Sequence, residues 1–264
     1  MNIFESRLIF DMTIDVYLEA DRISRGLLFD FSKEPSIAHV MLKDKKGDHY
    51  SMGRAIHTAV LEPHIFEKSF IRGPIDRRGK KWSDAKDRLT NRQELLTDGD
   101  YVKALQIRDS IWENNPRAKE IIENSIKEVT CFAEDDEGRK HKARADLLSM
   151  YSITDLKSTT SVDSDFFSKE IFKHGYHVQA AYYLDVFGNN YPSLSRGTFD
   201  FIAVEKEPPY ISNVFTLDKA AILLGRETYE KGLALYDSFV QNNKIITWPE
   251  PQTIDIPAWA YPRN

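Results

Sequence analysis

Asp155 and Lys157 stand two residues apart in the stretch ITDLKSTT (residues 153–160), where apolar and polar residues nearly alternate. Alternation of this kind predicts a β-strand. Side chains two residues apart on a strand point to the same face, roughly 6–7 Å apart along the strand. The pair is therefore either an ordinary ion pair at a sheet edge or one half of a metal site, and the rest of the chain must decide between them.

A second acidic residue favours the metal site. Asp146 lies in RADLL, nine residues before Asp155. Two adjacent antiparallel strands would bring these carboxylates within a few ångströms of each other. Close carboxylates repel unless a cation lies between them, and such oxygen ligands suit Mg²⁺, with Mn²⁺ as a substitute. Lys157 could then orient the attacking water or stabilise phosphate charge.

Three further side chains extend this set. Gln179 and Tyr183 are i and i+4 in a helical pattern, so they share one face and can hydrogen-bond a phosphate or a metal-bound water. Tyr182 competes with Tyr183 for that role, and Tyr183 could instead be core packing. His57 stands among small and apolar residues of an earlier helix, as a further metal ligand or as a buried, hydrogen-bonded histidine.

The sequence allows more than one role for two other carboxylates and for one basic segment. Glu62 is expected to cap or pair at a helix end, and Glu128 is either a secondary metal ligand or solvent-facing. The run DRRGKK (residues 76–81) is either a solvated loop or a contact to DNA phosphates, with a tryptophan stacking on an end base. The residues of the second interpretation are Arg77, Arg78, Lys80, Lys81 and Trp82.

The elements that must position these residues alternate between helix and strand. We expect a mixed sheet flanked by helices, an α/β fold in a single domain over residues 1–264. Hairpin and capping signals support the assignment around the site. The expected helices span 51–63, 83–96, 100–113, 163–175, 176–188 and 218–240, a glycine-rich basic loop spans 72–82, and the strands span 127–134, 141–150, 151–158, 196–206 and 210–217.

Composition narrows the class of protein. The 264 residues include 41% hydrophobic and 29% charged residues, which is ordinary for a soluble globular protein. No apolar run approaches the ~20 residues that span a bilayer, and the N-terminus lacks the pattern of a secretion signal. Cys131 is the only cysteine, which excludes an internal disulfide and favours a cytoplasmic protein. The net charge of −5 argues mildly against non-specific coating of nucleic acid, but leaves room for a local basic channel.

The motifs in this order resemble the RecB-type branch of the PD-(D/E)xK nuclease superfamily, and more closely the exonuclease VIII (RecE-type) nuclease domain. Four segments are similar to that family's histidine helix, Asp-x-Lys-Thr-Thr strand, Tyr-His-x-Gln helix and closing segment: GRAIHTAVLEP, TDLKSTT, YHVQAAYYLD and IPAWA. The resemblance covers residues 36–262, and the first fifty residues match poorly. Ser158 replaces a usual threonine. Asp155 replaces the superfamily's commoner glutamate, as it also does in the RecE-type branch.

The resemblance implies a restriction-endonuclease-like fold and a Mg²⁺-dependent exodeoxyribonuclease. It implies that His57, Asp146, Asp155 and the carbonyl of Leu156 hold metal, and that Lys157 activates water. It further implies 5′→3′ digestion of linear duplex DNA, a single-strand annealing (RecT-type) partner, a ring-shaped homo-oligomer and a phage or prophage recombination system. A RecB/Cas4-like nuclease acting on single strands or other ends, and a non-catalytic module that binds DNA ends, are the alternatives.

Overall fold

The computed structural model describes residues 3–33, 51–90, 93–188, 190–242 and 253–255. Its centre is a six-stranded sheet in the order β1-β4-β5-β6-β7-β8, and every neighbouring pair is antiparallel except β6 and β7. The expected mixed sheet flanked by helices is confirmed. The strands are β1 (Ile3–Ile9), β4 (Ile126–Asp135), β5 (Lys140–Leu148), β6 (Ser152–Thr159), β7 (Thr198–Glu205) and β8 (Ser212–Thr216).

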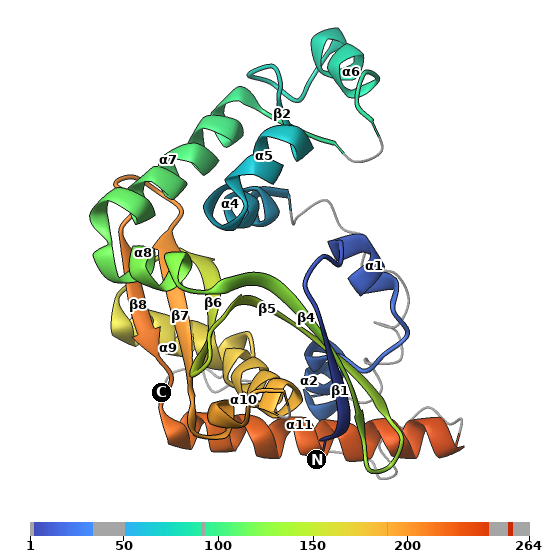
Figure 1. The fold of residues 1–264 in the computed structure, drawn as a ribbon. Coiled ribbons are helices and arrows are strands. Elements are labelled where there is room, and N and C mark those ends of the chain that lie inside the picture. The colour runs from blue at the N-terminus through green and yellow to red at the C-terminus, as the bar shows by residue number, and fades with distance from the viewer. Residues whose placement is uncertain (1–2, 34–50, 91–92, 189, 243–252, 256–264) are drawn as a thin grey trace, which may run out of the picture.

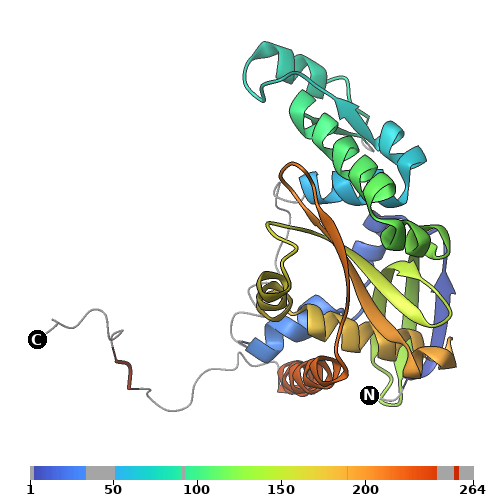
Figure 2. The same ribbon diagram turned by 90° about the vertical axis from the view of Figure 1, so that its left-hand side faces the viewer.

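Helices cover both faces of this sheet (Figures 1 and 2). On one face lie α2 (Arg25–Lys33), α9 (Ser164–Lys173), α10 (Tyr176–Gly188) and α11 (Lys219–Asn242). On the other lie α4 (Ser51–Leu61), α7 (Asp98–Asn114) and α8 (Pro116–Glu123). The short helix α1 (Ile14–Glu19) and the 3-10 helix η2 (Pro192–Arg196) complete the layers.

Each face buries its own hydrophobic cluster. The larger one joins the sheet to α2, α10 and α11 through residues such as Val129, Ile153 and Phe187. The second joins α4, α7 and α8 to the other face and includes Ile56 and Leu156. Burial of apolar surface is the main driving force for this packing. As a result, the strands that carry the conspicuous acids are held from both sides.

An arm extends from α4 away from the sheet (Figure 1). It consists of α5 (Pro63–Ser69), β2 (Phe70–Arg72), α6 (Lys80–Lys86) and β3 (Glu94–Leu96). A third cluster, including Phe66, Leu96 and Ala104, fixes the base of the arm on α7. The arm carries its own two-stranded parallel sheet, β2-β3.

The arm is where the predicted elements were wrong. The helix expected over 83–96 ends at Lys86, and residues 94–96 form β3 instead. The reason is tertiary: β3 pairs with β2 and places Leu95 and Leu96 in the interior, which no local pattern reveals. The loop expected over 72–82 begins with the last residue of β2 and ends inside α6. The other predicted helices and strands are confirmed to within a few residues.

The N-terminal part, to which no function was carried over, contributes to the core. β1 pairs with β4, and Leu28 and Phe31 of α2 are fully buried. The closing segment IPAWA (residues 256–260) lies outside the described residues. Within the described part of the chain, no helix combines the length and apolarity needed to cross a membrane.

Two glycines on one side of α11 allow it to approach its neighbours closely. A Cβ on Gly232 would lie 2.0 Å from the carbonyl oxygen of Leu28, and one on Gly225 would lie 2.1 Å from that of His177. Both distances are far below van der Waals contact, and both involve backbone atoms that cannot rotate away. Gly99, near the start of α7, has no such neighbour within 4 Å.

We predict that Gly232→Ala lowers the free energy of unfolding by about 1–3 kcal/mol, the usual range for overpacking. The matched substitution Gly99→Ala should leave stability unchanged or raise it by up to about 1 kcal/mol, because alanine favours a helix over glycine. Urea unfolding followed by circular dichroism measures both. Equal effects of the two substitutions would contradict the close packing of α11 on α2.

Candidate active site

The site forms where β5 and β6 separate. Their pairing comprises only Leu147 with Thr154 and Leu148 with Ile153, next to the turn that joins them. One residue further along, Asp146 and Asp155 are not paired with each other, although Asp155 pairs with Phe201 of β7 on its other side. The backbone N–H of Leu156 instead donates to Asp146 Oδ2 at 2.8 Å. The Asp146 side chain thus accepts a backbone hydrogen bond that, in a continued ladder, would go to a backbone carbonyl of β5.

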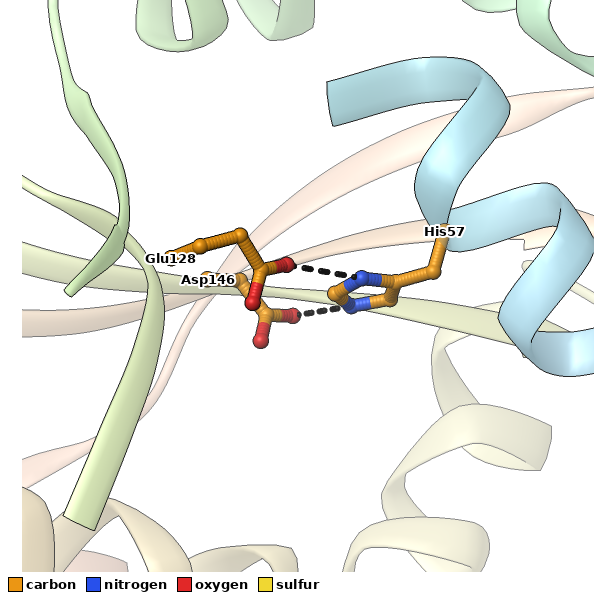
Figure 3. A group of neighbouring side chains, drawn as sticks. All are labelled: His57, Glu128 and Asp146. Carbon is orange, nitrogen blue, oxygen red and sulfur yellow. Dashed lines mark hydrogen bonds and ion pairs between the residues drawn. The ribbon is translucent and has the colours of Figure 1, made fainter. Parts of the chain in front are cut away.

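His57 on α4 lies between two carboxylates (Figure 3). Its Nε2 is 2.6 Å from Asp146 Oδ2, and its Nδ1 is 3.2 Å from Glu128 Oε1. One ligand atom from each of the three residues falls within 4.8 Å of the others, a spacing that could hold a metal ion. Imidazole nitrogen and carboxylate oxygen are ordinary ligands for divalent metals. The residues at this position therefore fit a metal site.

Glu128 reaches His57 through an unusual backbone. Its φ is 54°, in the left-handed region that strand residues other than glycine seldom adopt. Such a conformation costs on the order of 1–3 kcal/mol and is found where surrounding contacts enforce it, often at functional sites. Here the contact is Arg144, whose Nε donates to Glu128 Oε2 at 2.6 Å. Glu128 is therefore directed into the site, which resolves the open alternative against a solvent-facing role.

Asp155 is buried, at 3% exposure, and is contacted from two sides. Gln179 Nε2 of α10 donates to Oδ1 at 2.5 Å, and Lys157 Nζ lies 2.5 Å from Oδ2. The lysine contact has the distance of an ion pair but not the geometry of a hydrogen bond, so Oδ2 accepts none among the described residues. A buried carboxylate oxygen without a donor is costly unless a cation compensates it. Lys157 is that cation here, and it compensates the charge of Asp155 at a contact of 2.5 Å.

Charges in the site shift each other's pKa. Burial alone would lower the pKa of His57, but Asp146 and Glu128 outweigh it and raise that pKa well above its ordinary value. Burial and the charge of Asp155 raise the pKa of Asp146, against the opposing effect of His57. Burial also opposes the charge of Lys157, yet Asp155 and Asp146 raise its pKa. Without a metal, His57 and Lys157 are therefore both cationic near neutral pH.

The remaining predicted residues have different positions. Tyr183 lies on the same side of α10 as Gln179, and its ring packs against Phe187 and Phe199. Burial and the nearby Tyr17 raise the pKa of Tyr183 well above its ordinary value. Tyr182, the competitor, is fully buried and donates to the carbonyl of Ile23, so it is a core residue. Glu62 lies at a helix end as expected, in the N-cap position of α5, but its side chain makes no capping hydrogen bond.

Three residues of the site had not been singled out. Arg25 at the start of α2 donates to Gln179 Oε1 at 3.5 Å. The ring of Tyr176 lies 4.6 Å from Lys157 Nζ, a cation–π distance. Arg144 holds Glu128. Two signals could have found Tyr176: it precedes Gln179 and Tyr183 by three and seven residues, a helical spacing, and it is the tyrosine of the Tyr-His-x-Gln motif.

The basic residues of the arm are not part of this cluster. Arg78, Lys80 and Lys81 are exposed on and before α6, which Figure 1 places at the far end of the arm. Arg77 pairs with Asp100 at 2.9 Å and lies 5.9 Å from the ring of Trp82. If these residues contact a substrate, they do so at a distance from the carboxylates.

Comparison with known proteins agrees with this arrangement. A structure described as that of a "Putative exonuclease" from Eubacterium rectale matches with a TM-score of 0.60 and 15% sequence identity, over 91% of this chain and 96% of that one. At this identity the match establishes the fold alone. A search of curated proteins found no match.

The fold and the acid-x-lysine strand define a protein of the PD-(D/E)xK class. Within that class, the chain belongs to the family described as "PDDEXK-like domain of unknown function (DUF3799)", whose model matches residues 29–250. The match extends over α4, the three central strands and α10, the elements that supply the site.

We predict that this site binds Mn²⁺ more tightly as the pH rises. A metal requires His57 to be neutral, and the carboxylates raise its pKa, so binding at lower pH must displace a proton. Isothermal titration calorimetry from pH 6.5 to 8.5 should give a dissociation constant that falls by up to about tenfold per pH unit for one displaced proton. His57→Gln should weaken binding and flatten this dependence, while His64→Gln, on the exposed surface of α5, should not. An unchanged slope in His57→Gln would rule out His57 as a ligand.

Proposed function

We propose that the protein is a Mg²⁺-dependent exodeoxyribonuclease. The observation that carries the proposal is the convergence of the buried Asp155, paired with Lys157, on Asp146, which is paired with His57. Phosphodiester hydrolysis needs a cation to neutralise the phosphate, a positioned water and a group that stabilises developing charge. The chain assembles side chains suited to these roles within one cluster.

The metal ligands in this proposal are Asp146, Asp155 and the carbonyl of Leu156, together with His57. Glu128 joins them as an additional ligand or as the carboxylate that orients His57. A divalent cation held by such ligands stabilises charge on a phosphate and lowers the pKa of bound water. Oxygen-rich sites of this kind suit Mg²⁺ and Mn²⁺. Gln179 donates a hydrogen bond to Oδ1 of Asp155 and thereby orients this carboxylate.

Lys157 acts as a cation in this mechanism. Against the effect of burial, Asp155 and Asp146 raise its pKa, which favours the charged ammonium. Its ammonium can donate hydrogen bonds to the attacking water and to the scissile phosphate. Such preorganised donors contribute most in sites shielded from water, where Lys157 retains only 19% exposure. Gln179 and Tyr183 are then placed to orient the DNA or a bound water.

The finer parts of the proposal rest on the RecE-type motifs. They are digestion of linear duplex ends in the 5′→3′ direction, delivery of the 3′ strand to an annealing recombinase, and assembly into a homo-oligomeric ring. A ring would place a basic channel inside a protein whose net charge is −5. A RecB-like nuclease that prefers single strands or other ends is the second candidate, favoured by the stacked rings beside the site described below.

We predict that Lys157→Ala lowers the rate of Mg²⁺-dependent cleavage by at least about a hundredfold, because it removes the only lysine that contacts Asp155 in the described chain. The assay follows a blunt linear duplex labelled at one 5′ end, with Mg²⁺ or with EDTA. Wild type and Lys206→Ala, an exposed lysine after β7, should release the label as mononucleotide.

The same assay separates the alternatives. Label that stays on progressively shorter strands would keep the nuclease and reverse the polarity. Preference for a labelled single strand would select the RecB-like candidate. Wild type that binds DNA ends, but never cleaves them with Mg²⁺ or Mn²⁺, would leave only the non-catalytic binding module.

The tip of the arm is a second part of this proposal. Residues 72–88 contain seven Lys or Arg and three Asp, in a chain whose net charge is −5. Two of these cations, Arg72 and Arg77, pair with acids on α7. For Arg78, Lys80 and Lys81, the described residues contain no ion pair. They are therefore free to bind phosphates of the duplex beyond the site.

We predict that replacing Arg78, Lys80 and Lys81 together by alanine weakens duplex binding and reduces its dependence on salt. Each lost phosphate contact should lower the slope of log K against log salt by about 0.9. Arg117→Ala with Lys119→Ala on α8, where both cations pair within the helix, is the matched control. Fluorescence anisotropy between 50 and 200 mM salt gives the slopes, and equal slopes for all three proteins would remove the arm from the DNA interface.

A further inference from the structure

The turn between α9 and α10 carries four aromatic rings within six residues. Phe172 stacks on His177 with ring centroids 5.5 Å apart and planes at 14°. His174 stacks on Tyr176 at the same separation and 25°. Gly175 makes this interleaving possible, because its φ is 66° and a Cβ there would lie 2.5 Å from the ring of Phe29. The turn thus presents two stacked pairs in a fixed conformation.

The inner member of each pair belongs to the body of the protein and the outer member faces solvent. His177 is 4% exposed, and Tyr176 is half-buried. Phe172 is 68% exposed, and the side chain of His174 is 43% exposed. A phenylalanine that is two-thirds exposed contributes little to the core, and much of its ring is accessible to a ligand.

This surface is continuous with the active site. The ring of Tyr176 contacts the ammonium of Lys157, and α10 continues from it to Gln179, the partner of Asp155. Arg25 links the active site to the turn, because its guanidinium donates one hydrogen bond to Gln179 Oε1 and another to the carbonyl of His174. A polymer chain whose phosphate lies at Lys157 could therefore lay its next units along the turn.

The surroundings are cationic. Lys33 donates to the carbonyl of Lys173, and Lys173 itself is 68% exposed. Lys169 and Arg25 lie on the same two helices. The same two helices also carry the acids Asp30, Asp165 and Glu170, so their four cations exceed their acids by one. Glu170 pairs with both Lys173 and His174. Exposed rings interleaved with cations are the arrangement by which proteins bind single-stranded nucleic acid without strong sequence preference.

We propose that this turn is a stacking platform for the unpaired nucleotides of the DNA strand that enters or leaves the active site, with Phe172 and His174 as the rings that bases stack on. The proposal rests on the nuclease function and specifies the form of its substrate: the strand is single-stranded where it passes the α9–α10 turn. Inside a paired duplex the bases stack on one another and are not free to stack on these rings.

The test measures binding of a fluorescein-labelled twelve-nucleotide single strand by anisotropy, in EDTA so that no cleavage occurs. Phe172→Ala and His174→Ala should each weaken binding about five- to tenfold, within the range known for loss of one base–aromatic stack. Phe172→Tyr should bind like wild type, since it keeps the ring, whereas Phe172→Leu should resemble alanine. Tyr151→Ala is the control, because Tyr151 is 67% exposed on the β5–β6 turn.

A second readout reports stacking directly. The fluorescence of a 2-aminopurine placed in the same oligonucleotide should be quenched when the strand binds wild type or Phe172→Tyr. The quenching should be weaker with Phe172→Leu. A blunt duplex of equal length should change its affinity less than twofold in every variant. The stacking proposal would be wrong if Phe172→Ala and His174→Ala bound the single strand as wild type does. It would also be wrong if Phe172→Leu and Phe172→Tyr bound it equally.

These outcomes are independent of catalysis. If wild type binds the single strand in a ring-dependent manner but never cleaves DNA with Mg²⁺, the nuclease proposal fails and the platform remains as a binding site. If wild type cleaves and the ring variants bind and cleave like it, the nuclease stands and the platform is wrong.

Discussion

The hydrogen bond from the Leu156 N–H to the carboxylate of Asp146 is the constraint on which the site depends. It ends the pairing of β5 and β6 after two residue pairs and keeps the strands apart at Asp146 and Asp155. A continued ladder would have sealed that space with backbone hydrogen bonds. Instead two carboxylates converge there, supported by buried apolar residues on both faces of the sheet.

This convergence concentrates negative charge, and the neighbouring cations offset it. His57 lies between Asp146 and Glu128, Lys157 beside Asp155, and Arg144 behind Glu128. Each cation comes from a different element, so the balance exists only in the folded chain. Burial and the charge of Asp155 still raise the pKa of Asp146, and a divalent cation between the two carboxylates would relieve that repulsion.

Helix α10 connects the core to the chemistry. Its fully buried face, including Val178 and Tyr182, packs into the larger hydrophobic cluster. Tyr176 and Gln179, near its start, reach Lys157 and Asp155. The rings proposed to hold a single strand come immediately before, at the turn that positions the helix. Binding and cleavage would thus depend on one rigid element, whereas the basic arm would contact DNA further away.

The sequence by itself determined the chemistry and most of the fold. The Asp-x-Lys spacing fixed two charges on one strand face, the turn at residues 136–139 fixed the hairpin that carries Asp146, and helical spacing placed Gln179 with Tyr183, because these patterns are local. Only the tertiary structure decided that residues 94–96 pair with β2, that Glu128 adopts a left-handed backbone to reach His57, and that Arg25 meets Gln179. Each of these depends on a contact between segments distant in the chain, and its energy comes from packing and charge that no short stretch of sequence encodes.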